Sequence, residues 1–356
     1  MLMQKPSWYE GKSILITGVC GSVGRELLRQ LASTPNVVVT GIDNNESDLF
    51  FLAEQYGSHE DVEFFLGDLR DRDTLRQRFE GQDVVFHAAA FKHVGLSERS
   101  PRDAIQCNVI GTQNVIEAAN SAGVGCVNFT SSDKAVNPTN VMGTCKLLGE
   151  RLMTAAAVNS REKGTTYFST RFGNVLGSRG SVVPLFRQQI AAGGPVTLTD
   201  KSMTRFIMSM EQSVKLVMDA AQIAAGGEVF VTKMPVANIH DLATVMVEVL
   251  APTYGHAPSD IPIQVIGPRL GEKLYEELLS SEETHRAREL GDYIVVRPPT
   301  ACRARTGCEL VHAEDTSPVL RPYNSSVEDC MSQEELRIFL SRNGLLDCET
   351  GWEAAR

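Results

Sequence analysis

The 356-residue chain lacks several features that would assign it to common classes of protein. Basic residues are not in excess, because 34 Lys and Arg stand against 44 Asp and Glu, and the formal net charge is −10. Phosphate backbones need a basic face, so this balance argues against a nucleic-acid partner. No stretch approaches the roughly 20 apolar residues of a membrane span, and the first residues hold no run long enough for a signal peptide. We therefore expect a soluble, cytoplasmic protein without a membrane segment.

The eight cysteines lack the tight paired spacing of a zinc site. Cys302 and Cys308 are separated by five residues, and the lone His312 is the only histidine near them. Several other cysteines lie in apolar or glycine-rich stretches, which is typical of reduced thiols in a cytoplasm. We expect no metal site. The composition, 42% hydrophobic and 22% charged, is that of a globular protein with a sizeable core.

The chain does contain a glycine-rich loop between an apolar strand pattern at residues 13–17 and a helical pattern at residues 25–32. This order is the context that a dinucleotide-binding fingerprint requires. Glycines there let the backbone turn tightly and approach a pyrophosphate, which sits on the helix N-terminus. The loop residues expected to contact such a cofactor are Gly18, Gly21, Ser22, Val23 and Gly24.

Asp43 ends a second predicted strand at residues 37–42, 25 residues after Gly18. A carboxylate there can accept hydrogen bonds from both adenosine ribose hydroxyls. It would repel a 2′-phosphate, and no Arg follows at once in Asn44-Asn45-Glu46. The sequence therefore favours NAD and leaves NADP possible. The alternative is an ordinary polar residue at a strand end.

Further strands are predicted at 62–66, 84–86 and 126–130, with helices at 74–79 and 101–122. This alternation predicts an α/β fold, a Rossmann-like doubly wound parallel sheet. Residues after the third and fourth strands are also expected at the cofactor, namely Asp68, Leu69, Ala88 and Ala89. Asp68 could reach the adenine edge or instead cap the next helix. The small alanines would let a cofactor lie against the backbone.

The most informative stretch is 126–146, where a predicted strand ends in Ser131, Ser132, Asp133 and Lys134. In open α/β sheets, ligand-binding and catalytic residues lie at the carboxyl ends of the strands. Adjacent strand residues point to opposite faces, so this acid and base can face one ligand only where the strand breaks. The Asn137-Pro138 turn favours such a break; a surface ion pair is the alternative.

A helix after this turn carries Met142 and Lys146, four residues apart and therefore on one face. Taken alone, Met142 could be a core residue and Lys146 a solvated lysine.

Beyond residue 161 the pattern of alternating strands and helices changes. We expect a cofactor-binding domain over 1–165, its sheet continued by strands near 166–176 and 228–232. A smaller mixed C-terminal domain, mainly substrate-binding, is expected over 177–300, and a tail or surface-wrapping segment over 301–356.

Seven motifs in order resemble the nucleotide-sugar 4,6-dehydratases of the extended short-chain dehydrogenase/reductase superfamily. They are TGVCGSVG, GDLRD, HAAAFKHV, SSDKAVNPTNVMGTCK, RFGNVLGSRGSVVP, MTRF and RLGEKLYEELL. The resemblance covers roughly residues 10–300 and is greatest to the UDP-N-acetylglucosamine 4,6-dehydratases of bacterial glycan and flagellin-sugar pathways. An Asp-Lys pair after a hydroxyl residue marks this branch, whereas dTDP-glucose dehydratases carry Asp-Glu.

The resemblance implies a UDP-sugar substrate that is oxidised at C4, loses water across C5–C6 and takes hydride back at C6. Asp133 is then the general acid for the C6 hydroxyl and Lys134 the base at C5. Ser132 bonds the C4 oxygen, and Lys146 holds the nicotinamide ribose. Implied substrate contacts are Lys92, Asn174, Arg205, Arg269 and Glu272. The arginines suit a diphosphate, although Arg–Glu pairs also tie loops together.

One position departs from the superfamily pattern, because Met142 stands where YxxxK has its tyrosine. Methionine carries no proton, so the acceptor for the C4-hydroxyl proton is left open between Asp133, Lys134 and a water. The resemblance to methionine-containing members favours retention at C5, with inversion as the alternative. A UDP-hexose 4-epimerase and a catalytically inactive nucleotide-sugar sensor also fit parts of the pattern. We expect a homo-oligomer, with an isologous dimer as the default.

Overall fold

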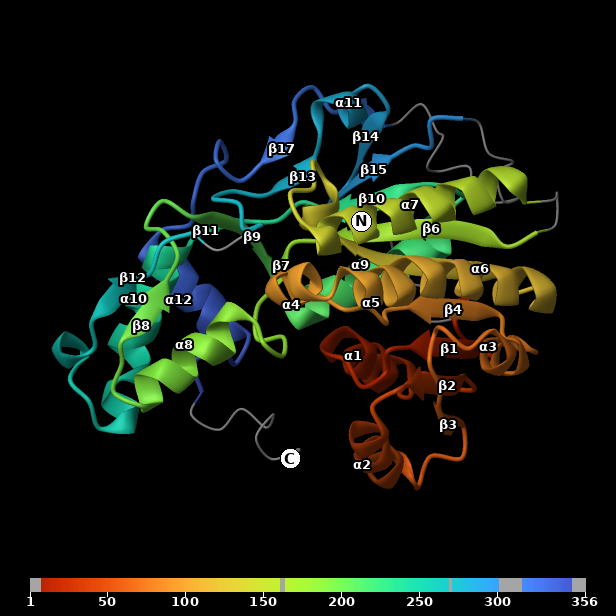
Figure 1. Ribbon diagram of the computed structural model, residues 1–356, viewed down its shortest axis with the longest axis horizontal. Coiled ribbons are helices and arrows are strands. Elements are labelled where there is room, and N and C mark those ends of the chain that lie inside the picture. The colour runs from red at the N-terminus through yellow and green to blue at the C-terminus, as the bar shows by residue number, and fades with distance from the viewer. Residues whose placement is uncertain (1–7, 161–163, 269–270, 301–315, 348–356) are drawn as a thin grey trace. The chain divides into compact units, whose positions relative to one another are not determined.

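The computed structural model describes residues 8–160, 164–268, 271–300 and 316–347 (Figure 1). The chain divides into two units. Unit 1 comprises Met1–Phe172, Ser213–Lys233 and Leu278–Pro322; unit 2 comprises Gly173–Gln212, Met234–Glu277 and Tyr323–Arg356. The domain boundaries expected from the sequence stay a prediction.

Among the described residues of unit 1, ten strands form one sheet in the order β16-β14-β15-β10-β6-β5-β4-β1-β2-β3. Neighbouring strands from β10 to β3 pair in parallel, while β15, β14 and β16 add an antiparallel extension beside β10. The strands are β1 (Ser13–Thr17), β2 (Val38–Asp43), β3 (Val62–Leu66), β4 (Val84–His87), β5 (Cys126–Ser132), β6 (Thr166–Phe172), β10 (Val229–Thr232), β14 (Ala287–Leu290), β15 (Tyr293–Val296) and β16 (Ser317–Pro318).

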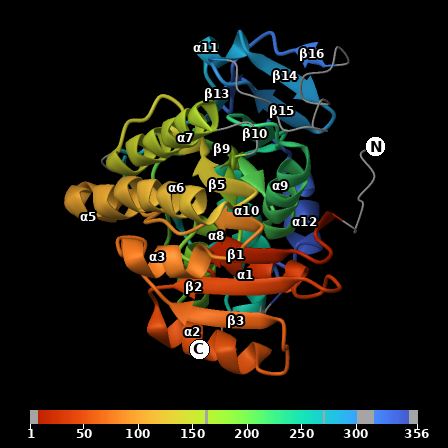
Figure 2. The ribbon, with the colours of Figure 1, turned by 90° about the vertical axis from the view of Figure 1, so that its right-hand side faces the viewer.

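Helices cover both faces of this sheet (Figure 2). Those described in unit 1 are α1 (Ser22–Leu31), α2 (Glu46–Tyr56), α3 (Arg72–Phe79), α4 (Val94–Arg99), α5 (Pro101–Ile105), α6 (Gly111–Ala122), α7 (Val141–Asn159), α9 (Met210–Ile223, from its fourth residue) and α11 (Ser281–Thr284). Helices α3, α6 and α7 lie on one face, and α1 and α9 lie on the other (Figure 2). The predicted doubly wound α/β fold is confirmed. A π-helical turn at Gln106–Ile110 joins α5 to α6, so the predicted helix 101–122 is continuous.

The order of the strands in the sheet reverses at one place, between two neighbouring strands. The chain runs outward from β1 to β2 and β3, then crosses back to β4, β5 and β6. The order of strands therefore reverses between β1 and β4, and ligands of open α/β sheets bind at such a reversal. Apolar side chains fix the layers around it. The core on the α3, α6 and α7 face includes Leu15, Ile42, Val85, Val127, Phe129 and Tyr167 from the strands, with Leu75, Phe79, Val115, Ile116 and Met153 from the helices.

Unit 2 is smaller and mixed. In its described part, β9 (Thr204–Met208) pairs antiparallel with β11 (Val236–Asn238) and parallel with β7 (Asn174–Val175). A second parallel pair joins β8 (Val196–Leu198) to β12 (Ile263–Val265). Helices α8 (Val182–Ala191), α10 (Ile239–Leu250) and α12 (Gln333–Arg342) pack around one apolar core that includes Phe186, Leu242, Met246, Leu336 and Leu340. Strand β13 (Glu277–Leu279) lies where the chain returns to unit 1, and β17 (Tyr323–Asn324) where it enters unit 2 again.

Some of these elements were not predicted. Helix α12 forms within the segment 301–356, for which only a tail or surface-wrapping segment was expected, and its Leu336 and Leu340, four residues apart, are both fully buried. Helix α10 and the antiparallel strands β14 and β15 were also missed. Across the described ranges, no helix combines the length and the apolar character needed to cross a membrane.

Candidate active site

The glycine loop runs from β1 into α1 at the point where the order of strands reverses. Gly18 has φ +73°, which favours glycine, and a Cβ placed on it would lie 2.6 Å from the Cα of Ala89. A Cβ on Gly24 would lie 2.2 Å from the carbonyl oxygen of Gly18. Gly21 is the N-cap of α1 and has no side chain to close the helix end, while Ser22, Val23 and Gly24 form its first turn. This bare helix N-terminus suits a pyrophosphate.

Asp43 occupies the end of β2 beside this loop. Its Oδ2 accepts a hydrogen bond from the backbone N–H of Cys20 at 3.0 Å, and its Oδ1 accepts one from the N–H of Asn45 at 3.0 Å. The carboxylate is therefore oriented by backbone on both sides. Burial, with the adjacent Asp43 charge, raises the pKa of the Cys20 thiol to about 12, so this cysteine stays a neutral thiol in the loop.

Asp68 follows β3 and is held by Arg70, not by a helix end. The Arg70 guanidinium donates to its Oδ1 at 2.8 Å and to its Oδ2 at 2.6 Å, and this side-chain hydrogen bonding lowers the pKa of Asp68 to about 2. The alternative helix-capping role was wrong, because Asp71 caps α3 by accepting from the N–H groups of Asp73 and Thr74. Leu69 is buried, and its carbonyl accepts from Asn114 at 2.8 Å.

The end of β4 supplies Ala88 and Ala89 directly against the glycine loop. The Ala88 N–H donates to the carbonyl oxygen of Thr17 at 3.1 Å, which joins the two strand ends. His87, one residue earlier, lies 2.8 Å from the Thr17 hydroxyl and 3.1 Å from the Thr112 hydroxyl. Burial and the Lys146 charge lower the pKa of His87 to about 3, so it is a neutral member of the core rather than a proton carrier at neutral pH.

Strand β5 ends at Ser132, and Asp133 begins a 3₁₀ turn over Asp133–Ala135. The break that the sequence predicted is therefore present. The Ser132 hydroxyl donates to Oδ1 of Asp133 at 2.6 Å, and the Lys134 ammonium donates to the same oxygen at 3.0 Å. The Asp133 side chain is fully buried and that of Lys134 is 21% exposed, so this is not a surface ion pair. Oδ2 of Asp133 is also buried, and no described residue hydrogen-bonds to it.

Helix α7 packs its first turn directly on this acid–base turn. A Cβ on Gly143 would lie 2.2 Å from the carbonyl oxygen of Lys134, so only a glycine fits there at this approach. Met142, the residue before it, is 4% exposed. Gly143 was not predicted as a site residue, although its place next to the altered YxxxK position was a signal that could have indicated it.

Lys146 lies one turn further along α7 and is almost completely buried. Its ammonium donates to the carbonyl oxygen of Thr130 at 2.7 Å and lies 4.7 Å from the centroid of the Phe129 ring. Burial lowers its pKa to about 8. The alternative of a solvated helix lysine is therefore wrong, and Lys146 is positioned against the same strand end that carries Ser132.

The loop after β4 is held by Asn108 of the π-helical turn, a residue that the sequence did not single out for a role. Its side chain accepts from the Phe91 N–H at 2.8 Å and donates to the Phe91 carbonyl at 2.9 Å. Lys92 follows in this loop with its side chain exposed. Its contact with a substrate stays a prediction. A π-turn is a common marker of a functional position in a helix, but it is not visible in sequence periodicity.

Three of the expected substrate residues lie in the described part of unit 2, and Arg269 lies outside the described residues. The Arg205 guanidinium donates to the carbonyls of Lys273 and Leu274 at 2.7 and 3.2 Å and lies 3.9 Å from Glu272. Glu272 accepts from the Thr199 hydroxyl at 2.9 Å. This geometry ties loops together, and a substrate role for Arg205, Glu272 and Asn174 of β7 stays a prediction. No metal-binding cluster of His, Cys, Asp or Glu occurs among the described residues.

The doubly wound sheet, the glycine loop at its reversal and a hydroxyl–acid–lysine turn beside a helical lysine define an extended short-chain dehydrogenase/reductase. The chain belongs to the polysaccharide biosynthesis protein family, whose model matches residues 14–298. It is 49% identical over 84% of its length to a protein of Methanocaldococcus jannaschii named as an uncharacterised membrane protein, of which the match covers 89%. Relatives of this family include nucleotide-sugar 4,6-dehydratases and 4-epimerases.

Two named relatives represent these activities. A UDP-N-acetylglucosamine 4,6-dehydratase (inverting) of Campylobacter jejuni is 39% identical, with 82% of this chain and 84% of that protein covered. A UDP-glucose 4-epimerase of Rickettsia canadensis is also 39% identical, with 79% and 82% covered. The chain spans only 46% of a probable polysaccharide biosynthesis protein of Bacillus subtilis, to which it is 41% identical.

Solved structures agree on the fold. The X-ray structure of Pen from Bacillus thuringiensis matches 95% of this chain and 99% of its own, with a TM-score of 0.86 and 40% identity. A dTDP-glucose 4,6-dehydratase of Streptomyces venezuelae, DesIV, matches 81% of this chain and 92% of its own with a TM-score of 0.67. At 22% identity, that second likeness supports the fold alone.

Proposed function

We propose that the protein is a nucleotide-sugar 4,6-dehydratase that converts UDP-N-acetylglucosamine to UDP-2-acetamido-2,6-dideoxy-4-hexulose. The observation that carries this proposal is the buried turn in which Asp133 accepts hydrogen bonds from both Ser132 and Lys134. Loss of water across C5–C6 needs a separate acid and base, and the turn supplies both from adjacent residues. The similarity to the Campylobacter dehydratase supports the substrate class.

The cofactor proposed is NAD, with NADP as the alternative. The residues fit a dinucleotide, because a Cβ on Gly18 would fill the close approach to Ala89 and because α1 begins without a side-chain cap. When bound, NAD supplies a hydride acceptor for C4 and a hydride donor for C6. Asp43 would accept from the adenosine ribose hydroxyls and oppose a 2′-phosphate. Lys146 would hold the nicotinamide ribose.

The proton of the C4 hydroxyl needs an acceptor, because Met142 has no proton to exchange. Ser132 is placed for this step, since its hydroxyl already donates to Asp133 at 2.6 Å. Ser132 Oγ takes the proton from the C4 hydroxyl of the sugar. At the same time the Ser132 hydroxyl passes its own proton to Asp133. Asp133 then gives that proton to the C6 hydroxyl as it leaves as water. Of the three acceptors left open by the sequence, this geometry favours Asp133, reached through Ser132.

Lys134 is the proposed base at C5. Once C4 is a ketone, the C5–H is acidic enough for an amine to remove, and Lys134 lies 3.0 Å from Asp133 Oδ1. The ammonium that donates to Asp133 first releases one proton to solvent, to which its side chain is 21% exposed, and the neutral amine then acts on C5. It takes the C5 proton as the C6 hydroxyl departs and returns it after C6 is reduced. A single base that returns the proton to the face from which it came retains the configuration at C5. We therefore propose retention, although the Campylobacter relative is named as inverting.

The test is to incubate the protein with UDP-N-acetylglucosamine in deuterated water and follow the sugar by mass spectrometry and NMR. We expect loss of one water, deuterium at C5 and the configuration of the starting sugar. A product of the opposite C5 configuration contradicts the single-base step. No dehydration with any UDP- or dTDP-sugar, despite cofactor binding, contradicts the function and favours an inactive sensor.

A UDP-hexose 4-epimerase is the second candidate, favoured by the Rickettsia relatives named UDP-glucose 4-epimerase. Epimerisation needs only hydride exchange at C4 and one proton acceptor. It has no use for a buried Asp–Lys pair, which is why the dehydratase is preferred. The same incubation separates the two, because an epimerised product keeps the mass of the substrate.

Two further expectations belong to this proposal. The free thiols of Cys20, Cys107, Cys126, Cys145 and Cys330 support a reducing cytoplasm as the place of action. A homo-oligomer, a dimer or larger, stays a prediction. Cell fractionation and light scattering on the purified protein test the two points, and a membrane-bound pool or a monomer would contradict them.

A further inference from the structure

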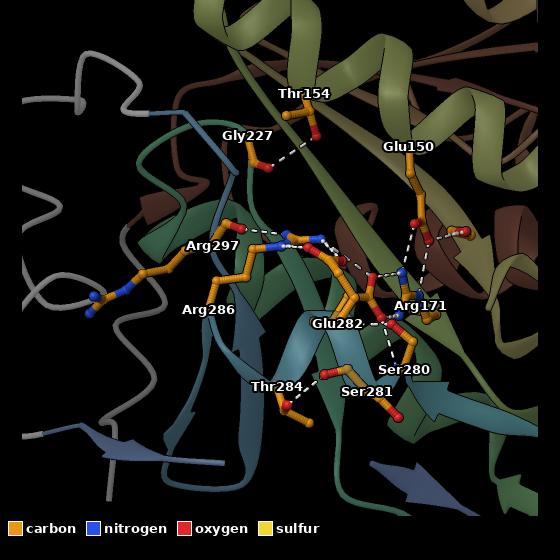
Figure 3. Close-up of polar contacts among 12 residues, drawn as sticks. Glu150, Thr154, Arg171, Gly227, Ser280, Ser281, Glu282, Thr284, Arg286 and Arg297 are labelled. Carbon is orange, nitrogen blue, oxygen red and sulfur yellow. Dashed lines mark hydrogen bonds and ion pairs between the residues drawn. The ribbon is translucent and has the colours of Figure 1, made fainter. Parts of the chain in front are cut away.

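Arg171, near the end of β6, is fully buried, and each of its guanidinium N–H groups has an acceptor. Figure 3 shows it beside Glu150. It donates from Nε and Nη2 to the carboxylate of Glu150 at 3.0 and 2.7 Å. It donates from Nη1 and Nη2 to the carboxylate of Glu283 at 3.1 and 2.9 Å, and from Nη1 to the carbonyl of Leu278 at 2.8 Å. No donor is left over for a substrate, so the role of Arg171 must be exerted through its partners.

Glu150 connects Arg171 to the candidate active site from two directions. Its Oε1 accepts a hydrogen bond from the buried hydroxyl of Ser131 at 2.6 Å, and Ser131 immediately precedes Ser132 in β5. It also lies four residues after Lys146 on α7, hence one turn away on the same face. The carboxylate of Glu150 therefore bridges the strand that ends in the acid–base turn and the helix that carries the buried lysine.

Glu283 extends the contact to the segment that re-enters unit 1. It closes a capping box with Ser280 at the start of α11, and Arg171 also binds the carbonyl of Leu278, the first residue of that segment. The chain leaves unit 1 after Phe172, one residue beyond Arg171. The same guanidinium thus lies next to the first point at which the chain leaves unit 1 and contacts the start of the last segment that returns to it.

A cluster of this kind is weak as a source of stability. Removing charges from water costs free energy that the attraction between them only partly repays, and apolar replacements of buried ion pairs are often neutral or stabilising. Its use is geometric, because forked guanidinium–carboxylate contacts hold their partners at fixed angles as well as distances. The three elements held here, β5, β6 and α7, are those that carry or flank Ser132, Asp133, Lys134 and Lys146.

We propose that Arg171 is a positioning residue which, through Glu150 and Ser131, holds the end of β5 and the lysine-bearing turn of α7 in register for catalysis. The proposal rests on the dehydratase function proposed above and adds to it residues that do not touch the substrate. Ser131 is the informative position, because Ser131→Ala removes one hydrogen bond to Glu150 and leaves both Glu150–Arg171 contacts in place.

The experiment compares Ser131→Ala with Thr170→Val. Thr170 is equally buried, lies on β6 beside β5, and its hydroxyl lies 3.2 Å from the Asn128 amide nitrogen, away from Glu150. We expect kcat to fall by about 10- to 100-fold in Ser131→Ala with KM nearly unchanged, because a small displacement of reacting groups has that effect. Ser131→Thr, which keeps a hydroxyl, should recover most of the loss. Equal kcat values in Ser131→Ala and Thr170→Val would overturn the proposal.

A readout that needs no turnover separates this proposal from the function on which it rests. Hydrogen exchange of the backbone amides of residues 132–135 should be faster in Ser131→Ala than in the wild type, and unchanged in Thr170→Val. If the wild type fails to dehydrate any sugar but this pattern holds, the function is wrong and the positioning stands. If the wild type is active and exchange is the same in all three proteins, the positioning is wrong.

Glu150→Gln adds a pH readout. Burial lowers the pKa of Lys146, and Cys107 of the π-helical turn, Glu150 and Cys145 of α7 act to raise it. The Lys146 charge in turn lowers the pKa of His87 of β4. The Glu150 charge raises the pKa of Lys146 against the lowering by burial. Glu150→Gln should therefore move the alkaline limb of kcat/KM to lower pH, while Ser131→Ala, which keeps the charge, should leave it in place. A limb that moves equally in both variants, or in neither, would overturn the link between Glu150 and Lys146.

Discussion

Gly18 and Ala89 approach so closely that a Cβ on the glycine would lie 2.6 Å from the Cα of the alanine. The two residues follow β1 and β4, the strands between which the order of the sheet reverses. Because of this contact, the glycine loop packs directly against the alanine-rich end of β4. A side chain at position 18 would force backbone apart at the place where a dinucleotide is expected.

Gly18→Ala should therefore abolish tight cofactor binding. Gly11→Ala is a matched control, because Gly11 has the same φ of +73° but no atom within 4 Å of the place that a Cβ would take. Both substitutions carry the left-handed backbone penalty, about 1 to 2 kcal/mol. Only Gly18→Ala should also weaken NADH binding, by tenfold or more, as measured by fluorescence titration. Equal affinities in the two variants would contradict the assignment of the loop.

Asp43→Asn should reduce the preference for NAD over NADP by about tenfold, the ratio that 1.4 kcal/mol produces. The substitution removes the negative charge and keeps one of the two oxygens, so one of the hydrogen bonds from the N–H groups of Cys20 and Asn45 can be retained. Asp48→Asn, on the neighbouring α2, removes the same charge away from the strand end. The ratio of the two dissociation constants should stay at its wild-type value in Asp48→Asn, and a shift there of the same size would point to a general charge effect.

Asp133→Asn should lower the rate of C4 oxidation by about 10² to 10⁴, since it removes the proton acceptor behind Ser132. Adding Met142→Tyr to this variant should restore C4 oxidation, seen as reduced nicotinamide absorbance, but not water loss. Met142→Phe in the same background is the control, equal in bulk but without a hydroxyl, and both must fit a buried site. Recovery with phenylalanine, or no recovery with tyrosine, would argue against the proton path through Asp133.

Lys146 should make the stability of the cofactor-free protein rise with pH above about 8. Its pKa is about 8 in the folded chain, where burial opposes the charge, against an ordinary value of 10.5. Below about pH 8 the lysine is charged in both states, and the free-energy cost of burying the charge is fully present. Between about pH 8 and 10.5 the unfolded chain holds a proton that the folded chain has lost, so the free energy of unfolding rises with pH. Lys146→Met has no charge to bury, so at about pH 7 its free energy of unfolding should exceed that of the wild type. This difference between the two proteins should shrink by about 3 kcal/mol between about pH 7 and pH 10.5. Denaturant titrations of both proteins measure it, and a constant difference would show that the lysine titrates normally.

The parallel part of the sheet was predictable because its strands are short apolar runs, and those from β1 to β5 alternate with helices along the chain. The acid–base turn was predictable as well, since Ser132, Asp133 and Lys134 are contiguous and Asn137-Pro138 follows at once. Helix α12 was not, because its apolar residues are few and become buried only against unit 2 side chains far earlier in the chain.

Long-range polar contacts were the other gap. Arg171 lies 21 residues after Glu150 and 112 residues before Glu283, and a sequence pattern carries no sign that one guanidinium will meet both carboxylates. A local choice was also left open by the sequence. Asp68 and Asp71 both precede α3, and only the structure shows that Asp68 pairs with Arg70 while Asp71 caps the helix. The acid–base turn could be found because its residues are contiguous, whereas Arg171 and its partners could not, because they are separated in the sequence.

Unit 1 is assembled from three separate stretches of chain, and this sets an order of events during synthesis. When residue 172 has left the ribosome, β6 is still an open edge, because its neighbour β10 lies at Val229–Thr232 and β15 follows only at Tyr293–Val296. Open edges with unpaired backbone groups invite association with other chains. A nascent chain halted between these points should therefore need protection, and a gene fragment ending near residue 172 should yield an aggregating product rather than a working cofactor domain.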